Sequence, residues 1–119
     1  MAAARIVCKS KSQRGGITAM LYAVYCLDGE NTAQLREQHR KVHREYLDIW
    51  NSKLFFSGPL LDDKDENIQL GSLFILKVND RAEAESFIQN ETFYNAGVFA
   101  KVTVFRMRKG RYNPALAVD

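Results

Sequence analysis

The segment MLYAVYCLD, Met20 to Asp28, opens the part of the chain that decides the fold. It is rich in aromatic and aliphatic residues and is followed by Gly29, which predicts a strand that ends in a turn. Three later segments have the same character, namely residues 53–57, 71–78 and 98–108. The sequence therefore predicts four strands.

Two helical segments separate these strands. Asn31 or Thr32 can cap a helix that continues to about Ser52, because apolar and aromatic residues recur there at steps of three and four. This stripe consists of Leu35, His39, Val42, Tyr46, Ile49 and Trp50. Asn79 or Asp80 can cap a second helix over residues 81–89. Residues 90–97 are expected to form an irregular or single-turn connection.

The predicted order is β-α-β-β-α-β, which is typical of ferredoxin-like α+β folds. Such a protomer has a four-stranded antiparallel sheet with two helices on one face. In the last strand, alternate residues point to opposite faces. One set is Val98, Ala100, Val102 and Val104, and the other is Phe99, Thr103, Phe105 and Met107. Both faces of the sheet are therefore expected to be apolar.

An apolar open face has a consequence for assembly. Two helices cover only one face of such a sheet, and a monomer rarely exposes a large apolar patch. Burial of that face against a second copy is the simplest remedy, and two-fold symmetry is the commonest arrangement. We therefore expect a homodimer that associates through the open sheet face.

The chain has 119 residues, which fits one domain. We place this domain at residues 20–109, between an N-terminal extension and a C-terminal tail at 110–119. Residues 1–19 contain four cations and no acidic residue. They are expected to be a disordered extension or an over-long start before Met20, with an organellar transit peptide as the alternative.

The net charge of +3 does not indicate a nucleic-acid partner. Residues 20–100 contain thirteen acidic and eight basic side chains, so the positive charge belongs to the two ends. A nucleic-acid-binding domain usually concentrates cations on one folded face. The sequence contains no run of eighteen apolar residues, so no membrane-spanning helix is expected. Two cysteines, Cys8 and Cys26, make no disulfide framework, which favours a cytoplasmic protein.

Two histidines, His39 and His43, lie four residues apart on the first predicted helix. A metal site would need a third ligand at a suitable spacing, and the sequence offers none, so no metal is expected. No cofactor-binding fingerprint is present either. His39 is interpreted as a packed core residue. His43 lies at the border of the apolar stripe beside Arg36 and Arg40, cations that favour a neutral imidazole able to act as a base.

Four stretches, taken in order, resemble the YCII-related (YciI-like) proteins of the dimeric α+β barrel superfamily. The first is MLYAVYCLD, and the second is the helix that carries Arg36, Arg40, His43, Tyr46 and Leu47. The third is LFFSGPLLDD followed by GSLFIL, and the fourth is RAEAESFIQ running into ETFYNAGVF. The resemblance implies a ferredoxin-like protomer, a dimer through the open sheet faces, and a cleft between the first helix and the sheet.

The same resemblance implies that His43 and Glu91 form a functional pair. Ser57, Gly58 and Gly97 are expected to line the cleft, and Arg36 is expected to bind the ligand with them. The family typically has Asp-Pro before the aromatic residue of this turn, whereas this chain has Glu91-Thr92. The carboxylate is kept, but it stands on a side chain longer by one methylene.

Two functions remain open at this stage. The first is a cofactor-independent isomerase or lyase that moves a proton on a small anionic or cyclic metabolite with the His–carboxylate pair. The alternative is a non-catalytic module that binds a small molecule in the same cleft or acts as an accessory protein. An enzyme should bring His43 and Glu91 within hydrogen-bond distance at a cavity wall.

Overall fold

A computed structural model describes residues 6–7 and 19–118. The strands are β1 (Ile6–Val7), β2 (Met20–Asp28), β3 (Leu54–Leu61), β4 (Gln69–Val78) and β5 (Phe99–Met107). The α-helices are α1 (Ala33–Ile49), α2 (Arg81–Gln89) and α3 (Thr92–Ala96). Two short 3-10 helices, η1 (Asn51–Lys53) and η2 (Pro114–Ala117), complete the described elements.

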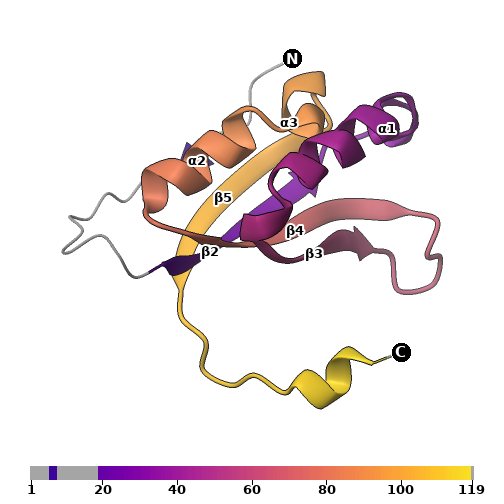
Figure 1. Ribbon diagram of the computed structural model, residues 1–119. Helices are drawn as coiled ribbons and strands as arrows, with labels where there is room; N and C mark the ends of the chain where they lie inside the picture. The colour runs from indigo at the N-terminus through magenta and orange to yellow at the C-terminus, as the bar shows by residue number, and fades with distance from the viewer. Residues whose placement is uncertain (1–5, 8–18, 119) are drawn as a thin grey trace.

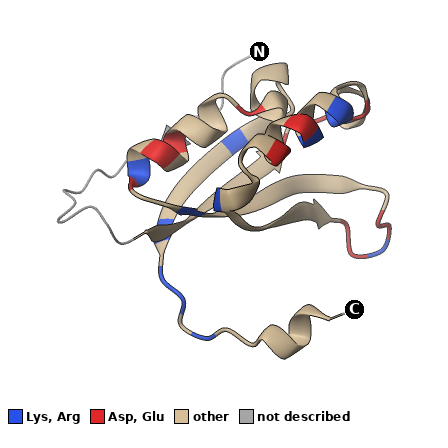
Figure 2. Ribbon diagram, in the orientation of Figure 1, with Lys and Arg blue, Asp and Glu red and all other residues tan. Residues whose placement is uncertain are grey.

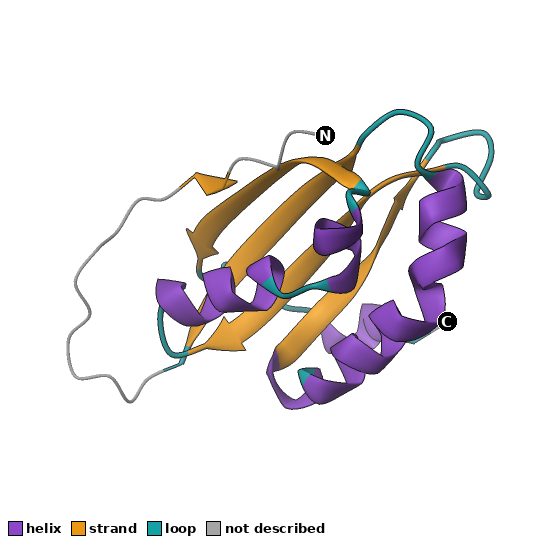
Figure 3. Ribbon diagram, turned by 90° about the horizontal axis from the view of Figure 1, so that it is seen from above, coloured by secondary structure: helices purple, strands orange, loops and turns teal. Residues whose placement is uncertain are grey.

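The strands form one sheet in the order β1-β5-β2-β4-β3. Strands β2 to β5 pair antiparallel, and β1 adds two residues in parallel to β5. Figures 1 and 3 show α1, α2 and α3 on one face of this sheet. The predicted ferredoxin-like α+β fold is confirmed.

The core lies between the helices and the sheet. Tyr22, Val24 and Cys26 of β2 point toward the helices and are buried. Phe74 and Leu76 of β4 lie beside them, paired with Val24 and Tyr22. The helices contribute Ala84, Phe87, Ile88 and Phe93. Because these residues come from the sheet, α2 and α3, the core fixes how these two helices sit above the sheet. Helix α1 packs against this core through the partly buried residues Leu35, Tyr46 and Leu47.

The open face of the sheet is apolar, as the strand pattern predicts. Phe56, Ile75, Ala23 and Phe105 form one cross-strand row over four strands. Phe56 is 66% exposed and Phe105 is 54% exposed. Charged residues instead lie mainly on the helices, in the loop between β3 and β4, and in the C-terminal segment (Figure 2).

Helix α1 differs from its prediction in length and orientation. It ends at Ile49, and η1 follows, so the expected single helix to Ser52 is wrong in its last turn. Val42 and Ile49, which were placed on the buried stripe, are 53% and 77% exposed. Arg36, which lies outside the predicted apolar stripe, is buried. The pattern of apolar residues did not predict this orientation of the helix, because such a pattern counts every arginine as a surface residue.

Strand β3 also differs from its prediction. It continues through Gly58-Pro59 to Leu61, whereas the sequence pattern ended it at Ser57. Proline lacks an N–H donor and is tolerated on an edge strand, and β3 is the edge of this sheet. Residues 90–97 contain α3, in accordance with the single turn expected there.

A β-bulge changes the face on which Phe99 lies. Asp28 pairs with Phe99 while Leu27 pairs with Lys101, so β5 has one extra residue at this point. Phe99 consequently points into the core and Ala100 is exposed, the reverse of the strict alternation that the sequence predicts. Most of the expected N-terminal extension lies outside the described residues, but Ile6–Val7 are paired with β5. None of the described helices is long and apolar enough to cross a membrane.

Candidate functional site

Helix α3 is built around the carboxylate of Glu91. Glu91 precedes the helix, and its side chain accepts hydrogen bonds from the N–H groups of Phe93 and Tyr94 at 3.0 and 3.2 Å. These are N–H groups that a helix cannot satisfy internally. At the other end, Gly97 adopts φ 88°, a left-handed conformation that glycine accepts readily. The chain can therefore make this short helix between two fixed ends.

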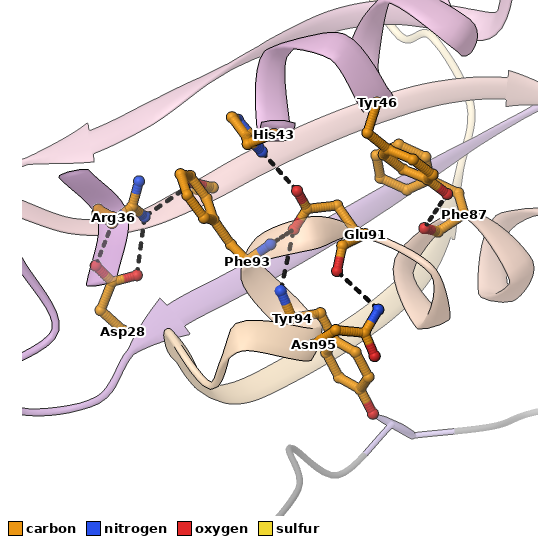
Figure 4. A network of polar contacts seen from close by, with 10 residues as sticks. Asp28, Arg36, His43, Tyr46, Phe87, Glu91, Phe93, Tyr94 and Asn95 are labelled. Atoms are coloured by element: carbon orange, nitrogen blue, oxygen red, sulfur yellow. Dashed lines mark hydrogen bonds and ion pairs between the residues drawn. The ribbon is translucent and has the colours of Figure 1, made fainter. Parts of the chain in front are cut away.

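The same carboxylate contacts His43 of α1. One oxygen, Oε1, accepts the two backbone N–H groups, and the other, Oε2, lies 2.5 Å from Nδ1 of His43 (Figure 4). Glu91 is fully buried. A carboxylate acts only as an acceptor, so this contact assigns the ring proton to Nδ1. Nε2 of the neutral ring is then unprotonated.

Phe93 fixes the plane of the His43 ring. The two rings are stacked, with centroids 3.9 Å apart and planes inclined by 12°. The guanidinium carbon of Arg36 lies 4.9 Å from the Phe93 centroid. Phe93 lies between Arg36 and His43 (Figure 4), which are two helical turns apart on α1. The imidazole is thus held by a hydrogen bond at one nitrogen and by a stack on one face.

Arg36 has its own set of partners. Nε and Nη2 donate to the two carboxylate oxygens of Asp28 at 2.7 and 2.9 Å. Nη2 also donates to Ser72 Oγ at 3.0 Å. Both members of the ion pair are nearly inaccessible to solvent. Such a bidentate pair fixes geometry, so the arginine acts as a structural clamp behind Phe93.

His43 lies at the wall of a cavity of about 230 Å³. Helix α1 contributes Arg36, Arg40, His43, Arg44 and Leu47 to the lining. The facing strands and α3 contribute Ser57, Gly58, Pro59, Gln69, Ser72, Phe74 and Phe93. Only 13% of the His43 side chain is exposed. The ring is sheltered, yet it borders a space large enough for a small molecule.

A model of the YCII-related domain matches residues 20–108. The chain belongs to the YCII-related family. A comparison with curated proteins gave no match.

Two solved structures are similar to this YCII-related protein. The first is 5-chloro-2-hydroxyhydroquinone dehydrochlorinase (TftG) from Burkholderia phenoliruptrix AC1100, in complex with 2,5-dihydroxybenzoquinone. It is 31% identical, with a TM-score of 0.71, and the match covers 79% of this chain and 99% of that one. The second is PA3566 from Pseudomonas aeruginosa, which is 13% identical with a TM-score of 0.49. That match covers 82% of this chain and 100% of PA3566.

The expected site residues of this YCII-related protein fall into two groups. His43, Glu91, Ser57, Gly58 and Arg36 meet at or directly behind the cavity. Gly97 is not among the residues that line this cavity, and it instead ends α3 in a left-handed conformation. Its place in the sequence motif reflects the left-handed turn that the backbone requires there.

Two contributors to the site were not predicted from the sequence. Phe93 stacks on His43, and Asp28 neutralises Arg36. The signal for Phe93 is its place directly after Glu91-Thr92, which puts it in the first turn of α3. The signal for Asp28 is weaker, since an acidic residue at the end of a strand is ordinary in a turn.

Other titratable groups near the site are held inactive by burial. Burial raises the pKa of Tyr46 to about 12, and its hydroxyl donates to the carbonyl of Phe87. Burial also raises the pKa of the Cys26 thiol well above its usual range, which disfavours a nucleophilic thiolate. Within the described part of the chain, no three His, Cys, Asp or Glu side chains cluster as metal ligands. His43 is thus the group best placed for proton transfer.

Proposed function

We propose that this protein is a cofactor-independent enzyme of the isomerase or lyase type, in which His43 moves a proton on a small ring substrate. The observation that carries the proposal is the contact between His43 Nδ1 and Glu91 Oε2 at a cavity wall. Glu91 is a positioning residue in this scheme, because it holds the ring and the tautomer without reaching the cavity. Phe93 also positions the ring, because it stacks on the imidazole, and Arg36 lies against Phe93.

The chemistry follows from the tautomer. Nε2 of neutral His43 takes a proton from a carbon of the substrate, and the imidazolium that forms is stabilised by Glu91. In an elimination, the electron pair of the C–H bond becomes the new π bond, and a leaving group such as chloride departs with the pair of its own bond. In an isomerisation, His43 returns the proton to a different atom. Neither route requires an oxidant or a reductant.

The similarity to TftG supports a ring-shaped substrate. That protein is a dehydrochlorinase crystallised with a dihydroxybenzoquinone, and 31% identity extends over nearly all of its length. The cavity has a compatible size, since an apolar cavity of about 150 Å³ can hold benzene. A volume of about 230 Å³ admits one six-membered ring with a few substituents.

The experiment is to incubate the protein with 5-chloro-2-hydroxyhydroquinone and related halogenated rings and to measure halide release. His43→Ala should lose turnover while His39→Ala, which removes the other histidine of α1 away from the cavity, should retain it. If the ring compounds bind and neither halide release nor isomerisation follows, the non-catalytic binding module is the correct function. Equal turnover by His43→Ala and the wild type would overturn the role of His43.

The proposed assembly is a homodimer through the open sheet face. Tyr25, Phe56, Phe105 and Met107 are all exposed on that face of the protomer. Because the facing patch on a second copy is equally apolar, the two faces are self-complementary in hydrophobicity. We therefore take the partner that covers this face to be a second copy of the same chain. The oligomeric state of the protein in solution tests this assignment.

A further inference from the structure

The charges that line the cavity are unbalanced. Its α1 wall carries three arginines four residues apart, Arg36, Arg40 and Arg44, together with His43. The facing wall, from β3 and β4, contributes the neutral polar residues Ser57, Gln69 and Ser72. No carboxylate is among the residues that line the cavity. The buried carboxylate behind it, Glu91, is already bonded to His43 and to two backbone N–H groups.

The three arginines differ in how far their charge is already compensated. Arg36 is fully engaged by Asp28. Arg40 forms an ion pair with Glu37, whose carboxylate is 74% exposed. Arg44 has no acidic partner within salt-bridge distance among the described residues. The uncompensated positive charge at the cavity therefore lies at Arg44, with a smaller contribution from Arg40.

We infer that the cavity selects a small planar monoanion, and that Arg44 is the residue that recognises its charge. The anionic group would accept hydrogen bonds from the guanidinium, which suits carboxylates and ring oxyanions. The ring would lie against Phe93 and Phe74, beside His43. The inference rests on the proposed function for the location of the site. It adds the charge class of the ligand, and it names Arg44 as the residue that binds the charged group.

A negative charge on the ligand is also compatible with the proton transfer proposed for His43. An anionic ring brings electron density to the carbon that loses or gains the proton, and Arg44 holds that charge in place. A neutral analogue of the same shape would leave the arginine without a partner as the cavity loses water. Discrimination should therefore depend on charge more than on size. This makes matched probes informative.

The test compares benzoate with benzamide, two probes of the same shape that differ in charge, by calorimetry on the full chain. The wild type should bind benzoate and bind benzamide at least about tenfold more weakly. Arg44→Gln should lose about tenfold in benzoate affinity without changing that for benzamide. Lys41→Gln is the matched control: it removes one cation from the same helix outside the cavity lining and should leave both affinities unchanged.

Several results would overturn the inference. These are equal affinity for the two probes, no binding of benzoate at its solubility limit, or equal losses in Arg44→Gln and Lys41→Gln. The last result would indicate a general electrostatic attraction by the cations of α1 and no specific contact between Arg44 and the ligand. His43→Ala separates this inference from the proposed enzyme. If that variant keeps the preference for benzoate and the wild type shows no turnover, the anion site stands and the catalytic proposal fails.

Discussion

Nδ1 of His43 lies 2.5 Å from Oε2 of Glu91, although 48 residues separate the two in the sequence. Glu91 can make this contact because its other oxygen is fixed by two backbone N–H groups of α3. One carboxylate thus caps a helix and orients a histidine. Stability and function are coupled at this residue.

Glu91→Gln should separate the two roles. The amide oxygen can still accept the N–H groups of Phe93 and Tyr94, so helix α3 should keep its cap. The amide nitrogen would donate toward Nδ1 of His43 and favour the tautomer that carries its proton on Nε2. We expect turnover to fall about 100-fold or more, as measured by steady-state kinetics, with little change in the unfolding midpoint.

Glu91→Ala supplies the comparison for that variant. It removes the cap as well as the histidine contact, and should cost about 1–3 kcal/mol in the free energy of unfolding. Denaturant titration of both variants measures the difference. Equal stability of the Gln and Ala variants would show that the cap contributes nothing.

Arg36→Leu should be severely destabilising. It leaves Asp28 buried without its cation, and losing one partner of a buried pair typically costs about 3–5 kcal/mol. Arg36→Lys should not restore stability, because an ammonium cannot make the bidentate contact or the stack on Phe93. Denaturant titration tests this prediction. A fully stable Arg36→Lys variant would contradict the role of the planar guanidinium group and its two hydrogen bonds to Asp28.

Phe93→Leu should affect His43 more than it affects binding of the ligand. Leucine keeps an apolar side chain in the core but removes the ring that stacks on the imidazole at 3.9 Å. We expect a drop in kcat and a displaced pH profile, because the imidazole is free to leave its plane. A variant with the wild-type pH profile would show that the stack is only packing.

Glu83 gives the protein a small pH-dependent contribution to stability. Partial burial would raise its pKa, but hydrogen bonds from the Asn79 N–H and from Lys53 lower it below its ordinary value of 4.5. A lowered pKa in the folded state stabilises the protein above 4.5, and this stabilisation is lost as the pH falls through the lowered value. Glu83→Gln should therefore be slightly less stable than the wild type at pH 7.

Because Glu83 is near the surface, that difference should be at most about 1 kcal/mol. Urea titrations at pH 7 and in strong acid, where both forms are neutral at this position, measure it. The difference should disappear in acid. If the difference in stability between the wild type and Glu83→Gln persists in acid, it must come from packing and not from the charge of Glu83.

The open sheet face gives a test of assembly. Phe105→Glu places a charge at the β5 end of the exposed row and should convert a dimer into a monomer in sedimentation experiments. Val42→Glu is the matched control, because Val42 is similarly exposed but lies on α1, on the other side of the sheet. A wild-type chain that sediments as a monomer at low micromolar concentration would contradict the dimer.

The order of the elements and the His43–Glu91 pair could be predicted from the sequence, the first from patterning and the second from a family resemblance. The burial of Arg36 could not, because its partner Asp28 lies on another element and periodicity counts both as surface residues. The reversal of Phe99 depends on a bulge, which adds one residue without a change in composition. In each case the missing information is a contact between separate elements that overrides a local rule.

The tautomer of His43 tests the central claim most directly. Two-dimensional ¹⁵N NMR of the imidazole nitrogens at neutral pH distinguishes a protonated nitrogen from an unprotonated one. We predict a neutral ring with its proton on Nδ1 and a free lone pair on Nε2, and the reverse tautomer in Glu91→Gln. A proton on Nε2 of the wild-type protein at neutral pH would contradict the account, because His43 could not then act as the base.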